Sequence, residues 1–115
     1  MPFISIHTTK KLGRDERDTI KTALGKEISM LPNKSEAVLM TEFIGGTDMY
    51  FGGEEKENCA FVEIRLFRTA PYEAKKAYTE LIFRTLEETL GLAEGEIYVT
   101  YVELDTWGTK GSLKM

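Results

Sequence analysis

The sequence has one cysteine, one histidine and three prolines among its 115 residues. A single cysteine excludes a disulfide within the chain. The one histidine, His7, leaves no His-based metal cluster or catalytic triad to assemble. The longest uninterrupted apolar run, residues 37–40, is far shorter than the ~18 residues that a membrane span requires. We therefore expect no metal site and no membrane-spanning segment.

Positive charge is also scarce. Fifteen Lys and Arg against 19 Asp and Glu give a formal net charge of −4 and a pI near 5.1. The broad basic surface of a nucleic-acid-binding protein is missing, so we expect no nucleic-acid partner. The glycines follow neither the G-x-G-x-x-G nor the P-loop order, which argues against a nucleotide site. The first residues do not resemble a secretion signal, so a cytoplasmic location is the expectation.

The composition that remains is typical of a folded domain. Hydrophobic residues make up 42% and charged residues 30% of the chain. The length suits one domain with a single core, which we place over residues 1–115.

The sequence also carries an internal duplication. Residues 3–6 and 61–64 share the order apolar, apolar, polar, apolar, which is typical of short strands. A helical period follows each of them, through residues 14–31 in the first half and between Pro71 and Gly91 in the second. A second strand follows each helix, over 36–43 and 96–103. The chain is thus predicted to be a βαβ unit made twice, with repeats at about 2–44 and 60–104.

Two such units predict an α/β protein of the two-layer α+β type, with a four-stranded mixed sheet and two helices on one face. The opposite face of that sheet would be uncovered. Residues 37–40 and 97–102 are apolar on both alternations, apart from Thr100, which indicates strands buried on two sides. An oligomer packed through the sheet face, or cover from a C-terminal arm, would satisfy that pattern. Residues 45–58 are expected to be a turn-rich connection, and 105–115 a tail with little regular structure.

Pro2 carries the most chemical information in the sequence. Removal of Met1 would expose a secondary amine at the start of a buried strand. An α-amino group has an ordinary pKa of roughly 7.7 to 8.0, and burial disfavours its charged form. The amine would then be neutral near pH 7, as a general base must be. A proline after Met is common in proteins where it has no catalytic role, so Pro2 alone does not establish this chemistry.

Further motifs resemble a known family over residues 2–112. They are Pro2-Phe-Ile, Met49-Tyr-Phe-Gly-Gly, Cys59-Ala-Phe and Ile97-Tyr-Val-Thr-Tyr, together with Lys34, which stands 17 residues before Phe51. They resemble the tautomerase superfamily, in the branch of macrophage migration inhibitory factor and the phenylpyruvate tautomerases. The resemblance implies a homotrimer whose sheets line a barrel, with an active site at each subunit boundary. It also implies a cofactor-independent keto–enol tautomerase acting on phenylpyruvate-like aromatic α-keto acids.

The resemblance assigns roles to six positions. Pro2 matches the catalytic amino-terminal proline, which passes a proton between the enol oxygen and the adjacent carbon. Lys34 matches the lysine that holds the substrate carboxylate, and Phe67 the position whose backbone N–H contacts substrate. Tyr98 matches a tyrosine that reaches the site from the adjacent subunit. Trp107 lies in the tail that closes over the aromatic end of the substrate.

Two departures from the family pattern affect the expected site. Thr100 stands where relatives often have asparagine, and its shorter hydroxyl changes the hydrogen bond offered to substrate. The terminal Ser112–Met115 lacks the phenylalanine seen in many relatives. Val62 replaces the second thiol of the Cys-x-x-Cys that animal relatives can show, so a dithiol activity is excluded.

Two other readings remain open at this point. One is a non-catalytic, cytokine-like binding protein of the same fold, with a protein receptor and secretion without a signal peptide. The other is a superfamily isomerase or dehalogenase with another substrate. Those branches usually add arginines at the site, and Arg65 and Arg68 are the candidates near the expected strand.

Overall fold

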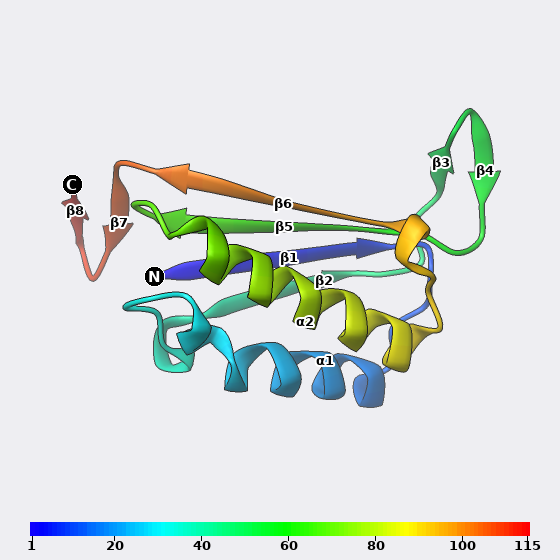
Figure 1. The fold of residues 1–115 in the computed structure, drawn as a ribbon, viewed down its shortest axis with the longest axis horizontal. Helices are drawn as coiled ribbons and strands as arrows, with labels where there is room; N and C mark the ends of the chain where they lie inside the picture. Colours follow the sequence, from blue (N-terminus) through cyan, green and yellow to red (C-terminus); the bar gives the residue numbers. More distant parts are fainter.

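The computed structural model describes all residues, 1–115, and contains the predicted four-stranded mixed sheet. The elements in chain order are β1 (Pro2–Thr8), α1 (Arg14–Lys26), η1 (Ile28–Met30), η2 (Glu36–Val38), β2 (Met40–Ile44), β3 (Met49–Phe51), β4 (Glu54–Lys56), β5 (Ala60–Phe67), α2 (Tyr72–Leu90), η3 (Glu94–Glu96), β6 (Ile97–Leu104), β7 (Trp107–Thr109) and β8 (Ser112–Lys114), where η marks a 3-10 helix. The sheet order is β2-β1-β5-β6. Within each repeat the two strands are parallel, and the central strands β1 and β5 are antiparallel. Both long helices cover one face of the sheet, as expected (Figure 1).

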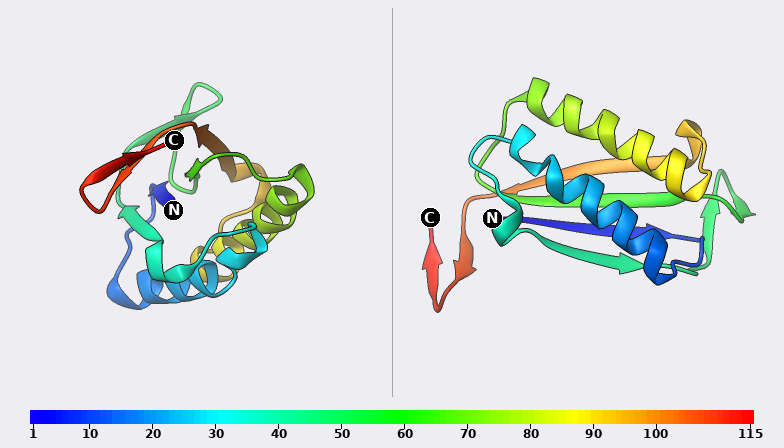
Figure 2. Two further views of the ribbon diagram at one scale, coloured as in Figure 1. Left: turned by 90° about the vertical axis from the view of Figure 1, so that its left-hand side faces the viewer. Right: turned by 90° about the horizontal axis from the view of Figure 1, so that it is seen from below.

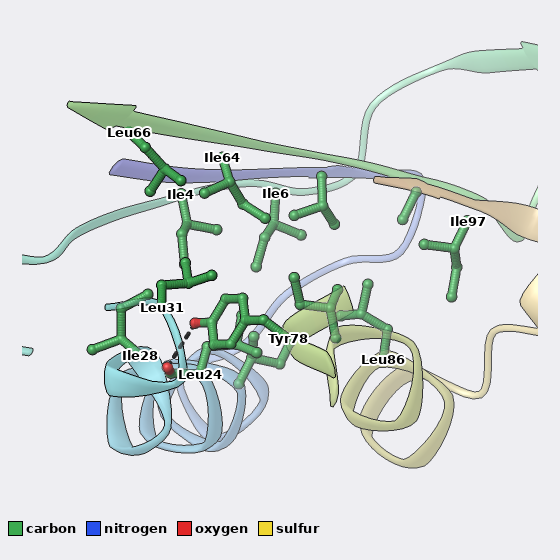
Figure 3. Close-up of a cluster of buried hydrophobic side chains, with 14 of the residues drawn as sticks. Ile4, Ile6, Leu24, Ile28, Leu31, Ile64, Leu66, Tyr78, Leu86 and Ile97 are labelled. Carbon is green, nitrogen blue, oxygen red and sulfur yellow. Dashed lines mark hydrogen bonds between the residues drawn. The ribbon is translucent and has the colours of Figure 1, made fainter. Parts of the chain in front are cut away.

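The core lies between the sheet and the two helices. Ile4 and Ile6 of β1 and Ile64 of β5 are fully buried against the helices, because alternate residues of a strand point to the same face. Tyr78 of α2 lies in the middle of this core, and its hydroxyl donates a hydrogen bond of 2.7 Å to the carbonyl oxygen of Leu24 in α1 (Figure 3). This bond joins the two helices inside the apolar layer.

The ends of α2 agree with the sequence. Pro71 is the residue before the first helical turn, and Gly91 ends the helix in the left-handed conformation with φ of 70°. Gly91 donates its N–H to the carbonyl oxygen of Glu87, as a residue at this position commonly does.

The predicted strand 36–43 is wrong at its start. Glu36–Val38 forms a 3-10 helix, and the strand runs from Met40 to Ile44. The side chain of Ser35 accepts a hydrogen bond from the N–H of Ala37, which caps this short helix at the place where a ladder bond was expected. Val38 and Met40 are 48% and 67% exposed in the single chain. The expectation of a strand buried on both sides over 37–40 is therefore also wrong.

Both segments expected to lack regular structure form hairpins, so these two expectations are wrong. The pair β3–β4 extends beyond one end of the sheet, and β7–β8 stands at the other end, near the N-terminus (Figures 1 and 2). Two-residue turns close them: Gly52-Gly53 have φ of 65° and 82°, and Lys110-Gly111 have φ of 52° and 81°. Two successive positive φ values match the right-handed twist of a hairpin, which explains the glycines.

The face of the sheet away from the helices is mixed rather than uniformly apolar. Glu42, Ser5, Glu63 and Thr100 pair in register and form a polar row across all four strands. The Ser5 hydroxyl donates to Oε1 of Glu42 at 2.9 Å and lies 3.1 Å from Nε2 of His7. An adjacent row holds Met40, Phe3, Arg65 and Val102. We refer to this surface as the open face.

Neither helix has the length and apolar composition required to cross a bilayer.

Candidate active site

Pro2 lies at the N-terminal end of a central strand and faces a pocket. It is buried, and its register partner on β5 is Leu66. The pocket has a volume of about 510 Å³. Its walls come from both ends of the chain and from three strands: Met1, Pro2, Phe3, Val38, Met40, Arg65, Leu104, Thr106, Trp107, Gly108 and Thr109. The hairpin β7–β8 thus contributes to a pocket that surrounds the start of β1 (Figure 2).

Lys34 lies next to the N-terminus but is not among the pocket walls. It is in the loop between η1 and η2, and its Nζ donates a 3.1 Å hydrogen bond to the carbonyl oxygen of Phe67 at the end of β5. Burial lowers the pKa of Lys34. The bond fixes the ammonium group at the same end of the sheet as Pro2.

The α-amino group of the chain already shows the electrostatics that a general base needs. In this structure the group belongs to Met1, and its pKa is lowered from 8.0, first by burial and second by the positive charge of Lys34. Both causes arise from the position at the end of β1 rather than from the methionine side chain. A chain that began one residue later would place its amine closer to the buried strand.

The structure brings four of the six expected site residues to one end of the sheet. Pro2 and Trp107 are pocket walls, and Lys34 is bonded to Phe67 beside them. The Phe67 ring also lies 5.0 Å from the guanidinium carbon of Arg68. Phe67 is therefore held through its carbonyl group and its ring, while its N–H is the group that the resemblance assigns to substrate.

Tyr98 and Thr100 lie elsewhere in the same chain. Tyr98 pairs with Phe61 toward the far end of the sheet, and its ring centroid is 5.2 Å from that of Phe51 in the β3–β4 hairpin. Six residues separate Tyr98 from Leu104 at the pocket, or ~20 Å along a strand. Tyr98 is 59% exposed on the open face. Within one chain, neither residue joins the pocket.

The pocket contains residues that the sequence did not assign to the site. Val38, Met40 and Leu104 give it apolar walls, and Arg65 gives it a cation. For Arg65 a signal existed, because alternation along β5 places it on the face opposite the core residues Ile64 and Leu66. The apolar walls depend on the 3-10 helix and the C-terminal hairpin, which were not foreseen.

Glu103 is a further missed residue, which fixes the loop after β5. Its Oε2 accepts a 2.6 Å hydrogen bond from the N–H of Ala70, and its Oε1 lies 3.1 Å from Nζ of Lys75. The pKa of Glu103 is lowered, chiefly by the bond from Ala70, with Lys75 adding to it. This carboxylate joins β6 to the start of α2 close to Phe67.

No group of three or more His, Cys, Asp or Glu side chains in the chain is arranged to hold a metal ion. The single cysteine, Cys59, is buried, and its Sγ lies 4.0 Å from Sδ of Met49.

Comparison with known proteins supports the same architecture. No curated protein sequence matches the chain significantly. The structure is similar to Leishmania major MIF2 (TM-score 0.88, 24% identity, covering 98% of this chain and 97% of that one). It is also similar to the macrophage migration inhibitory factor-like protein of Entamoeba histolytica (TM-score 0.82, 20% identity, 97% of each chain).

A third similar structure is Pt0534 inactivated by 2-oxo-3-pentynoate (TM-score 0.83, 13% identity, 95% of this chain and 93% of that one). At these identities the structures show a shared fold. The sequence profile of the macrophage migration inhibitory factor family matches residues 1–113. The chain therefore belongs to the macrophage migration inhibitory factor family and has the tautomerase-superfamily fold.

Proposed function

We propose that the protein is a cofactor-independent keto–enol tautomerase for phenylpyruvate-like aromatic α-keto acids, with Pro2 as its general acid and base. One observation carries the proposal: the start of β1 is a buried end of the chain that faces a pocket, where the pKa of the α-amino group is lowered. The proposal requires Met1 to be removed, because a retained Met1 makes the Pro2 nitrogen an amide without a basic lone pair.

The reaction needs one group that first accepts and then returns a proton. The neutral Pro2 amine takes the proton from the enol oxygen, which leaves an enolate and a secondary ammonium ion. The ammonium ion then gives that proton to the adjacent carbon, and the α-keto acid leaves with the amine neutral again. A lowered pKa supports both steps, because the amine is free at neutral pH and its conjugate acid is a good donor.

Lys34 is proposed to bind the substrate carboxylate. Its hydrogen bond to the Phe67 carbonyl uses one of the three N–H donors of the ammonium group, and two remain for an anion. The same positive charge lowers the pKa of the neighbouring amine. Lys34 would thus contribute to substrate binding and to the protonation state of Pro2.

We further propose that the active unit is a homotrimer. The support is that Tyr98 and Thr100 lie on the open face, away from the Pro2 pocket of their own chain. A cyclic arrangement of three chains brings Tyr98 of one chain beside Pro2 of the next, and covers open faces and strand edges together.

The first test measures the N-terminus and the activity together. Intact-protein mass establishes the fraction of chains that begin at Pro2, and phenylpyruvate tautomerisation is followed on the fully trimmed protein. A preparation that retains Met1 is the matched control, since it differs by that residue alone. We expect turnover in the trimmed protein and none above buffer in the control.

Two substitutions separate the assigned roles. Pro2→Ala should lower kcat, since a positioned acid–base group contributes roughly 100- to 10,000-fold in rate. Lys34→Ala should act mainly on KM, because it removes a binding contact. Absence of turnover in the trimmed wild type would reject the tautomerase and favour a binding protein of this fold. Equal, modest losses in both parameters for both variants would reject the two assignments.

A further inference from the structure

Arg65 is the one charged residue in the walls of the Pro2 pocket. Its register partner is Phe3, the residue next to Pro2, and its guanidinium carbon lies 5.9 Å from the Phe3 ring centroid. Its side chain is 53% exposed. The pocket has no acidic wall residue to oppose this cation. The potential inside the pocket is therefore positive on the β5 side.

The guanidinium group is only partly occupied by its own ion pair. Nε of Arg65 lies 2.5 Å from Oε1 of Glu63, two residues earlier on the same strand. The two terminal nitrogens have no hydrogen-bond partner in the chain. Glu63 lies outside the pocket walls, so the carboxylate holds the stem of Arg65 from one side while the terminal N–H groups stay free. Two adjacent N–H donors of this kind match the two oxygens of a carboxylate.

Arg65 and Lys34 are separate cations with different partners. Lys34 is bonded to the Phe67 carbonyl outside the pocket walls, whereas Arg65 projects from the open face into the pocket. Apolar wall residues complete the pocket around Arg65: Val38, Met40, Leu104 and Trp107. A ligand with an apolar body and an anionic group at each end would use all three features.

We propose that Arg65 forms a second anion-binding subsite, which makes the pocket prefer α-keto acids that carry another carboxylate on the far side of their apolar body. The proposal refines the substrate class of the proposed tautomerase and rests on that function for its catalytic meaning. The binding preference itself does not depend on turnover.

Binding is measured first, by the fluorescence of Trp107, which is the only tryptophan in the chain and a wall of the pocket. The probes are phenylacetate, with one carboxylate, and 4-carboxyphenylacetate, with two. We expect the wild type to bind the dianion about tenfold more tightly, as one charge-assisted contact allows. Arg65→Gln should abolish this preference and leave the affinity for phenylacetate nearly unchanged. Arg65→Lys, which keeps the charge, should retain part of it.

Two further variants complete the design. Glu63→Gln removes the partner carboxylate and should strengthen the preference for the dianion. Arg84→Gln is the matched control, because Arg84 is exposed on α2 and its loss changes the net charge by the same amount. Its preference should equal that of the wild type. Equal losses of both probes in Arg65→Gln would show a structural or general carboxylate role and would overturn the proposal, as would an unchanged preference.

Kinetics then distinguish the subsite from the tautomerase. In trimmed protein, the ratio of kcat/KM for 4-carboxyphenylpyruvate to that for phenylpyruvate should fall about tenfold in Arg65→Gln. Turnover with a ratio that Arg65→Gln leaves unchanged would overturn the subsite while the tautomerase stands. Absence of turnover with an Arg65-dependent binding preference would support the subsite and reject the tautomerase.

Discussion

The α-amino group at the start of β1 is the residue-scale feature on which the proposed chemistry depends. Two causes lower its pKa, with burial first and the positive charge of Lys34 second. Their order matters, because a change at Lys34 removes only the smaller cause. The amine should keep a lowered pKa when Lys34 is neutralised, although less so than in the wild type.

This reasoning predicts the pH profile of a Lys34→Gln variant. The amine acts as a base only when neutral, so kcat/KM falls as the pH decreases below its pKa. Loss of a neighbouring positive charge makes protonation easier and raises that pKa, which moves the acidic limb of the profile to higher pH. Lys34→Arg keeps the charge and serves as the control, with its limb near the wild-type position. A Lys34→Gln limb at the wild-type pH would contradict the electrostatic role of Lys34.

A second residue-scale prediction concerns Glu103. Its pKa is lower in the folded chain than in the unfolded chain, so it adds stability above the unfolded pKa of about 4.3. That stability is lost as the pH falls through the folded pKa. Glu103→Gln should therefore be less stable than the wild type in urea unfolding at pH 7, and the difference should shrink in acid. Glu80→Gln, at an exposed position on α2, is the control. A difference that is constant across the acidic range would contradict this account.

At the scale of elements, the repeated βαβ units were predictable because their apolar periods are long and regular. The shorter pieces were not. Apolar residues 37–40 favoured a strand, yet the cap from Ser35 to the N–H of Ala37 makes a 3-10 turn locally better. Both hairpins had a readable signal in Gly52-Gly53 and Lys110-Gly111, which are two-residue turns between short strands. The pocket could be predicted only in part, because half of its walls come from these pieces.

The contact between α1 and α2 gives a prediction at the element scale. Tyr78→Phe removes the hydroxyl that donates to the Leu24 carbonyl and keeps the ring that fills the core. We expect a loss of about 1 kcal/mol in the free energy of unfolding, measured by chemical denaturation. Tyr72→Phe is the matched control, because Tyr72 lies on the same helix and is exposed. A Tyr78→Phe protein as stable as the wild type would show that the bond between the helices contributes nothing measurable.

At the scale of the whole molecule, the single chain holds only part of the expected site. Pro2, Lys34, Phe67 and Trp107 meet at one end of the sheet, while Tyr98 stays near the other. The sequence resemblance placed Tyr98 in a neighbour's site, and the position on the open face is compatible with that placement. No periodicity within one chain could have indicated a contact that only a second chain provides.

The proposed trimer predicts recovery of activity in mixed assemblies. Sedimentation equilibrium should report about three times 13.1 kDa. Pro2→Ala and Tyr98→Ala proteins should each have low activity. When the two are unfolded, mixed and refolded together, some sites combine an intact Pro2 with an intact Tyr98 and activity should rise. Mixing without refolding is the control. A fully active monomer, or a mixture that stays as inactive as its parents, would reject the shared site.

The duplication sets the number of amine-dependent sites. The two repeats place Pro2 at the start of β1 and Ala60 at the corresponding start of β5. Ala60 is inside the chain, so its nitrogen belongs to a peptide bond and cannot act as a base. Doubling the scaffold has therefore left the reactive group in single copy. Titration with a reagent that consumes the terminal amine should reach its end point at one equivalent per chain, although the sheet offers two similar strand ends.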